Sequence, residues 1–149
     1  MSIGAAILLL LGGLLVIALI IAANGFFVAQ EFSYMSVDRA RLRAQAEAGD
    51  KAAQQALKVT KRTSFMLSGA QLGITVTGLM VGYVAEPMVG QALGTLLGTT
   101  GLSSATAIGV GTVAALILAT VIQMIFGELY PKNLSLAIPD PMARRLARP

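Results

Sequence analysis

The sequence predicts an all-α membrane protein with three transmembrane helices and a juxtamembrane helical hairpin on the cytoplasmic side. Of its 149 residues, 56% are hydrophobic and only 12% carry a charge, whereas soluble domains have roughly 25% charged residues. Three apolar stretches also reach the roughly 20 residues that an α-helix needs to cross a bilayer. We therefore expect a multi-pass protein of the cell membrane, surrounded mainly by lipid.

The three predicted transmembrane helices cover about residues 3–30, 65–85 and 106–127. In the first of them, Asn24 is the only strongly polar residue before Val28. The second and the third contain no charged residue. Runs of this length without charge are typical of membrane-spanning helices rather than of buried helices in soluble proteins.

The segment of about residues 36–62 is polar, rich in alanine and free of proline, which predicts the helical hairpin or an interfacial helix. Gly49-Asp50 is the expected break, with Asp50 as the N-cap of the following helix. The hairpin carries only a narrow apolar stripe, formed by Leu42, Ala46, Leu57 and Val59. This pattern favours a helix pair packed beneath the membrane bundle over a separate partner-binding module.

The basic residues orient the chain in the membrane. Seven of the eleven lie between Gln30 and Ser64, the other four follow Phe126, and the connection 86–105 has none. Loops rich in lysine and arginine remain in the cytoplasm. We expect the amino terminus and the 86–105 connection outside, and the hairpin and the carboxyl terminus inside.

The composition argues against an enzyme and against nucleic-acid binding. The chain has no cysteine and no histidine, which removes disulfides, thiolate metal sites and the commonest general base. The net charge of +4 comes from basic residues that flank the hydrophobic segments, where they meet anionic lipid headgroups.

The motif Gly127-Glu128-Leu129-Tyr130-Pro131-Lys132 ends the third predicted helix. Pro131 has no N–H, so a helix through it leaves the carbonyl of Gly127 without its usual donor. A free carbonyl beside a carboxylate offers the oxygen ligands that Mg²⁺ and Ca²⁺ prefer. The alternative interpretation is a stop-transfer boundary, in which Glu128 and Lys132 mark the water interface.

The second predicted helix is rich in small residues, with the pairs Gly69/Gly73 and Gly78/Gly82 spaced four apart. Such pairs let helix backbones approach closely in lipid, so we expect this helix at the centre of the fold or at a subunit interface. Gln71 and Thr75 share one face of it.

Polar groups from all three helices are expected at a similar depth near the cytoplasmic face, which favours a cation site over a stop signal. These candidates are Asn24, Glu31, Gln71, Thr75, Gly127 and Glu128.

Three motifs, in order along the chain, resemble those of CNNM/CorC-type magnesium transporters. Asn24-Gly25-Phe26-Phe27-Val28-Ala29-Gln30-Glu31-Phe32, followed by Ser36-Val37-Asp38-Arg39, resembles the end of the first helix in that family. Gln71-Leu72-Gly73-Ile74-Thr75, followed by Glu86-Pro87, resembles the second helix of a bacterial branch. Gly127-Glu128-Leu129-Tyr130-Pro131-Lys132 resembles the signature of the third helix.

The resemblance implies a homodimeric three-helix domain with an inward-facing, largely dehydrated Mg²⁺ site, and export of Mg²⁺ coupled to Na⁺ entry. In the family pattern, Glu128 matches the acidic ligand and the Gly127 carbonyl matches the backbone ligand. Ser36 lies near the position of a serine ligand, while Gln71 and Thr75 stand where the well-known branch has asparagines. Family members usually continue into paired CBS modules and a small carboxyl-terminal domain, so we expect this to be the membrane domain of a longer protein.

The leading hypothesis is therefore a divalent-cation transporter domain that exports Mg²⁺. Its expected ligands are Glu128, Gly127, Thr75, Gln71 and Asn24, with Ser36 and Glu31 as further candidates. A second hypothesis, motivated by the altered second helix, is a membrane scaffold or accessory subunit that moves no ions. A third is the export of an organic cation such as a polyamine, which requires an elongated acidic groove.

Overall fold

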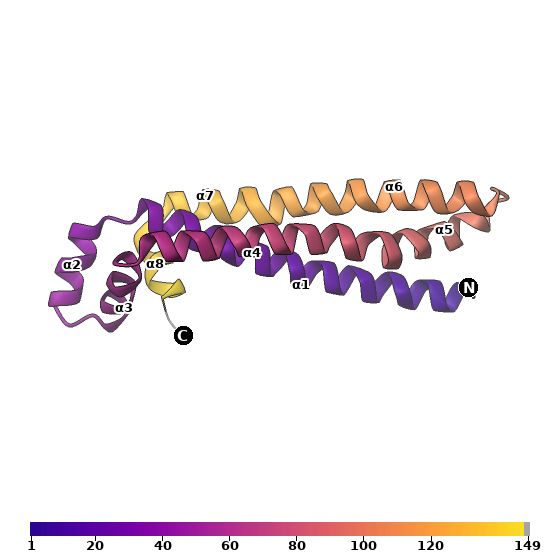
Figure 1. Cartoon of the computed structure of the whole chain (residues 1–149). Helices are drawn as coiled ribbons and strands as arrows, with labels where there is room; N and C mark the ends of the chain where they lie inside the picture. The colour runs from indigo at the N-terminus through magenta and orange to yellow at the C-terminus, as the bar shows by residue number, and fades with distance from the viewer. Residues whose placement is uncertain (148–149) are drawn as a thin grey trace. The chain divides into compact units, whose positions relative to one another are not determined.

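The computed structural model describes residues 1–147, all in helices and short connections (Figure 1). Arg148, one of the four basic residues that follow Phe126, lies outside these residues. The elements are α1 (Ile3–Ser36), α2 (Arg39–Glu47), α3 (Lys51–Thr60), α4 (Thr63–Val84), η1 (Ala85–Gly90), α5 (Gln91–Gly98), α6 (Ser104–Ile122), η2 (Gln123–Leu129), α7 (Tyr130–Ala137) and α8 (Pro139–Leu146). In the described residues, three helical stretches are long and apolar enough to cross a membrane, which confirms the predicted class.

All three spanning stretches are longer than predicted: they cover Ile3–Ser36, Thr63–Gly98 and Ser104–Ala137. The predicted 86–105 connection is largely helical, because the chain continues through η1 and α5. η1 and η2 are π-helical turns, and each contains or closely precedes a proline. Proline has no N–H for the hydrogen bond to the residue four positions earlier. A π turn, whose hydrogen bonds span five residues, accommodates the proline and lets the helix continue.

The chain forms two compact units. The first unit comprises residues 1–23 and 76–126, and the second comprises 24–75 and 127–149. In the first unit, α1, α4, η1 and α6 share an apolar core that contains Ile17, Ile20, Ile21, Val81, Ala85, Val89, Ala115 and Ala119.

Within the first unit, α5 packs on α6 through glycines (Figure 1). A Cβ built on Gly111 would lie 2.6 Å from the backbone nitrogen of Gly94 and 2.8 Å from the carbonyl oxygen of Gly90. Only a residue without a side chain permits this approach. In each predicted small-residue pair of α4 one glycine is closely packed: a Cβ on Gly73 would lie 2.6 Å from the Phe27 ring and a Cβ on Gly78 would lie 3.2 Å from Gln123 Nε2. A Cβ on Gly69 or Gly82 would meet no atom within 4 Å.

The second unit contains the predicted hairpin. α2 and α3 pack against each other, and α8 packs against α3 (Figure 1). Their core consists of Tyr34, Val37, Leu42, Ala46, Ala53, Ala56, Met66 and Ala143, with Leu57 and Val59 packed against it. The narrow apolar stripe therefore packs inside this unit, as the sequence predicts.

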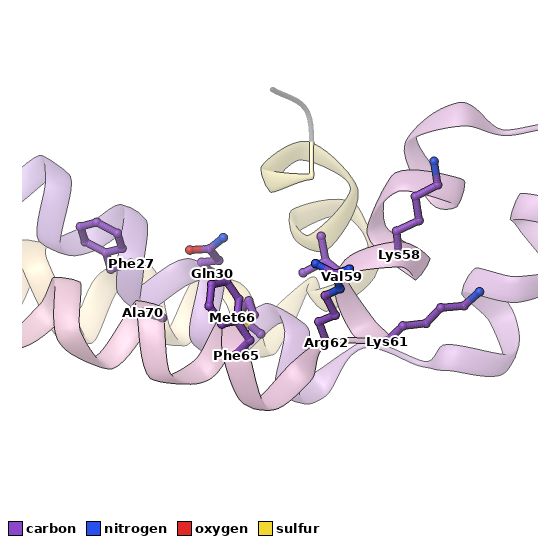
Figure 2. Close-up of a pocket in the computed structure, with 10 residues that line it drawn as sticks. Phe27, Gln30, Lys58, Val59, Lys61, Arg62, Phe65, Met66 and Ala70 are labelled. Atoms are coloured by element: carbon purple, nitrogen blue, oxygen red, sulfur yellow. The ribbon is translucent and has the colours of Figure 1, made fainter.

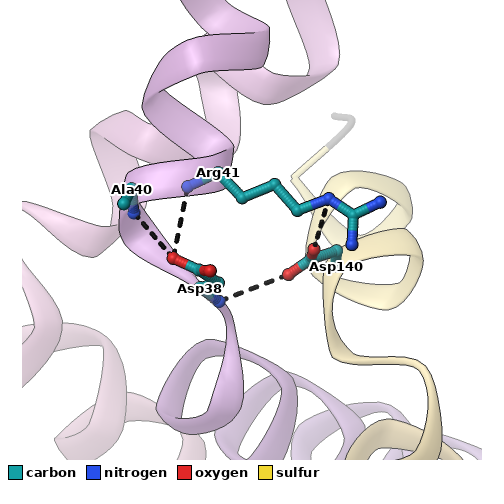
Figure 3. A network of polar contacts seen from close by, with 4 residues as sticks. All are labelled: Asp38, Ala40, Arg41 and Asp140. Atoms are coloured by element: carbon teal, nitrogen blue, oxygen red, sulfur yellow. Dashed lines mark hydrogen bonds and ion pairs between the residues drawn. The ribbon is translucent and has the colours of Figure 1, made fainter.

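Asp38 and Asp140 link α8 to the start of α2. Asp38 caps α2 by accepting from the backbone N–H groups of Ala40 and Arg41, at 2.9 and 3.2 Å. Its own N–H donates to Asp140 Oδ1 at 3.3 Å, and Arg41 Nε lies 3.4 Å from Asp140 Oδ2 (Figure 3). One carboxylate thus joins the cap and the first turn of α2 to α8.

Asp50 caps α3 and links it to α8. The chain turns at Gly49 with a φ of +94°, which favours glycine. Asp50 then caps α3 by accepting from Ala52 and Ala53 N–H, at 2.9 and 3.1 Å, and forms an ion pair with Arg144. The hydrogen bond from Ala53 is the main cause that lowers the pKa of Asp50 below its usual 3.8; desolvation opposes it and the Arg144 charge adds to it.

The lowered pKa predicts acid sensitivity at the start of α3. The stabilisation by Asp50 is complete above the carboxyl's ordinary pKa of 3.8 and is lost as the pH falls through its lower value in the fold. We expect the first α3 amides to lose protection in hydrogen exchange, corrected for intrinsic rates, below that pH. Asp50→Asn is the control, because asparagine caps equally well but does not titrate; the same pH dependence in that variant would contradict the assignment.

Candidate cation site

All seven site residues predicted from the sequence fall within the second unit. Their elements are the last part of α1, the first part of α4, and the η2–α7 junction. These residues are Asn24, Glu31, Ser36, Gln71, Thr75, Gly127 and Glu128. The structure links some of them directly and leaves others apart.

Asn24 and Gly127 form the central contact. Asn24 is fully buried, and its Nδ2 donates to the carbonyl oxygen of Gly127 at 2.9 Å across 103 residues of sequence. Pro131, four residues after Gly127, has no N–H to offer this carbonyl, so the Asn24 amide takes the place of the missing helical donor. A carbonyl oxygen has two lone pairs, and one hydrogen bond does not exhaust its capacity to bind a cation.

Gln71 and Glu31 form a second link, between α4 and α1. Gln71 Nε2 donates to Glu31 Oε1 at 3.3 Å, and Glu31 is half-buried. Thr75 donates its hydroxyl to the carbonyl of Gln71 at 2.9 Å, which is the ordinary backbone bond of a threonine within a helix. Gln71 and Thr75 are exposed.

Glu128 follows Gly127 within the π turn and is exposed. Lys132 is one turn further on and would be the usual partner, but its Nζ lies 4.8 Å from the centroid of the Phe32 ring, as a cation–π contact. Among the described residues no side chain pairs with Glu128. Ser36 is also exposed, at the end of α1, and has no hydrogen bond to another of the seven.

Contacts that the sequence prediction did not include hold α7 and α8 against α1. Ser135 is fully buried and donates to the carbonyl of Ala29 at 3.2 Å. Tyr34 donates to the carbonyl of Ala143 at 3.0 Å. With the Lys132–Phe32 contact, they fix the η2–α7 junction that presents Gly127 and Glu128. The sequence around Ser135 and Tyr34 only weakly indicates these hydrogen bonds, because each partner is more than 100 residues away.

Comparison with known proteins agrees with this architecture. The sequence model of the cyclin M (CNNM) transmembrane N-terminal domain matches residues 14–149. The chain belongs to the CNNM transmembrane-domain family. It is 41% identical over 131 residues to the UPF0053 protein MT1890 of Mycobacterium tuberculosis, covering 88% of this chain and 29% of that protein. It is 32% identical over 136 residues to the UPF0053 protein YugS of Bacillus subtilis, covering 91% and 32%.

Membership of the CNNM family confirms the resemblance seen in the three motifs. It identifies the chain as a multi-pass membrane domain of a transporter-type family rather than of an enzyme family. The chain spans about a third of the length of these curated relatives.

Proposed function

We propose that this CNNM domain binds Mg²⁺ at the Gly127-Glu128 turn and exports it from the cytoplasm in exchange for Na⁺. The observation that carries the proposal is the carboxylate of Glu128, unpaired among the described residues, next to a carbonyl that the following proline deprives of its helical donor. A carboxylate in a membrane-spanning helix is costly without a partner. A bound cation supplies that partner.

The ligand chemistry favours Mg²⁺ over other metals. The chain has no histidine or cysteine, the ligands that softer transition metals prefer. Within the described residues, no three acidic, histidine or cysteine side chains cluster as a metal site. Mg²⁺ keeps several waters and binds through one or two carboxylates, whereas Ca²⁺ takes six to eight oxygen ligands. Export and Na⁺ exchange are inferred from the family resemblance.

Asn24 and Gln71 have supporting roles in this proposal. Asn24 holds the Gly127 carbonyl in place, and Gln71 positions Glu31, the candidate second carboxylate. Thr75 and Ser36 stay predicted neutral ligands. Assembly as a homodimer and regulation by CBS modules also stay predictions.

The test is Mg²⁺ binding to the purified chain by calorimetry, with Ca²⁺ as the competing ion. We expect saturable Mg²⁺ binding in the wild type and an affinity at least about 100-fold lower in Glu128→Gln, since loss of even an outer-shell partner costs 10- to 100-fold. Glu47→Gln is the matched control, because Glu47 is an exposed carboxylate on α2. Circular dichroism must show that all three proteins are folded.

Two results would overturn the proposal: no Mg²⁺ binding by the folded wild type, or unchanged binding by Glu128→Gln. If binding behaves as expected, flux of Mg²⁺ from proteoliposomes, with and without a Na⁺ gradient, tests transport and its coupling.

The scaffold hypothesis has one observation in its favour. Asn24 and Gln71 each donate an amide N–H to a group on another helix. These bonds are expected if the polar groups only hold the helices together. Absence of Mg²⁺ binding in the experiment above would favour it. The polyamine hypothesis gains no support, because the cavities of about 730, 640 and 320 Å³ in the second unit are lined by lysine or arginine with at most one carboxylate each.

A further inference from the structure

A groove of about 730 Å³ in the second unit has one apolar end and one basic end. Figure 2 shows Phe27, Met66 and Phe65 towards one end and Lys58, Lys61 and Arg62 towards the other. The groove is formed by the last part of α1, the end of α3 and the first turns of α4. It includes none of the seven candidate cation ligands.

The apolar end is open and lies on membrane-spanning helices. Phe65, in the first turn of α4, is 81% exposed. Gly69, one turn later, leaves room in the groove, since a Cβ built there would meet no atom within 4 Å. Phe27 of α1 also lines the groove, and its ring packs against Gly73. Such a surface suits an acyl chain better than water.

The basic end carries three cations without a counter-charge. Lys58, Lys61 and Arg62 are exposed, and no described residue forms an ion pair with them. In the same unit, Arg41 and Arg144 both have aspartate partners. Lys58 lies in the last turn of α3, and Lys61 and Arg62 directly follow that helix. An anion in the groove would supply the missing counter-charge.

The two ends meet where the second membrane span begins. Thr63 starts that span, so the cations directly precede it while Phe65 and Gly69 lie within it. A phospholipid has the same order, with its phosphate at the surface and its chains in the hydrocarbon. Basic residues beside a span attract anionic lipids.

We propose that this groove binds an anionic phospholipid of the adjoining leaflet. Its phosphate lies against Lys58 and Arg62, with Lys61 beside them, and one acyl chain follows Phe27, Phe65 and Gly69. The proposal is independent of the Mg²⁺ site.

The test is native mass spectrometry of the detergent-purified chain, titrated with phosphatidylglycerol and phosphatidylcholine of identical acyl chains. We expect one phosphatidylglycerol to bind at least about tenfold more tightly than phosphatidylcholine, as expected when two cations near the surface each contribute about 1 kcal/mol. Lys58→Gln/Arg62→Gln should abolish the preference. Gly69→Trp keeps every charge but fills the apolar end, and should weaken both lipids.

Lys51→Gln/Arg145→Gln is the matched control, because it removes the same charge from exposed positions of the same unit outside the groove. It should bind both lipids as the wild type does. Thermal unfolding checks the fold of each variant, and the charge and volume variants test the groove independently.

The proposal is overturned if the two lipids bind the wild type equally, or if the control loses as much preference as the groove variant. It is also overturned if Gly69→Trp leaves the affinity for both lipids unchanged, or if inorganic phosphate displaces phosphatidylglycerol as well as free phosphatidylglycerol does. Lipid binding by the monomer that is lost in a dimer of the chain would likewise overturn it.

Discussion

Gly111→Leu is expected to disrupt the packing of α5 on α6 and to destabilise the first unit by more than about 3 kcal/mol, beyond the usual range for an overpacked core. The position has no spare volume, because even a Cβ would lie 2.6 Å from the Gly94 nitrogen and 2.8 Å from the Gly90 oxygen. Both are backbone atoms, which cannot move aside as the end of a flexible side chain can. The two helices must separate.

Hydrogen exchange in detergent measures this effect, with loss of amide protection expected in α5 and α6. Protection of α2 and α3, which belong to the other unit, should change little. Gly109→Leu is the matched control on the same helix, since a Cβ at Gly109 would meet no atom within 4 Å. Equal effects of the two substitutions would show that leucine in α6, rather than the contact with α5, is responsible.

Gly73→Ala is expected to destabilise the second unit by about 1–2 kcal/mol, although alanine is the better helix former by about 1 kcal/mol. A Cβ at this position would lie 2.6 Å from three atoms of the Phe27 ring. The ring is rigid and half-buried, so either α1 and α4 move apart or Phe27 turns into the groove. The steric cost of the added Cβ therefore exceeds the gain in helix propensity from glycine to alanine.

Reversible unfolding in mixed detergent and SDS, followed by circular dichroism, measures this change. Gly69→Ala, one turn earlier on α4, is the control. It gains the same helix propensity without a contact, and is expected to be neutral or slightly stabilising. If Gly73→Ala were as stable as Gly69→Ala, the close packing of α1 on α4 at Phe27 would be refuted.

The membrane class and the hairpin could be predicted from the sequence because they depend on local patterns. Apolar length marked the spans, and Gly49-Asp50 marked the turn and the cap, which the structure bears out. The helix ends were less predictable. The sequence prediction ended the second helix at about residue 85, but η1 carries it on to α5, because a π turn accommodates Pro87 and Gly94 of α5 packs on α6.

The candidate site was predictable in its members but not in their pairing. Grouping polar residues by depth in the membrane brought together six residues, the family resemblance added Ser36, and all seven belong to one unit. It could not show that Asn24 donates to Gly127, that Gln71 donates to Glu31, or that the side chains of Ser36 and Glu128 take no part in either hydrogen bond.

The sequence by itself thus determined the features that depend on a few neighbouring residues: the apolar spans, the turn of the hairpin with its Asp50 cap, and a carbonyl at Gly127 that Pro131 deprives of its donor. Only the tertiary structure decided that Asn24 satisfies this carbonyl, that Lys132 lies on Phe32 rather than beside Glu128, and that Gly111 needs to be a glycine. The physical reason is that these outcomes depend on how each helix is rotated against its neighbours. That rotation is set by packing between segments far apart in the sequence.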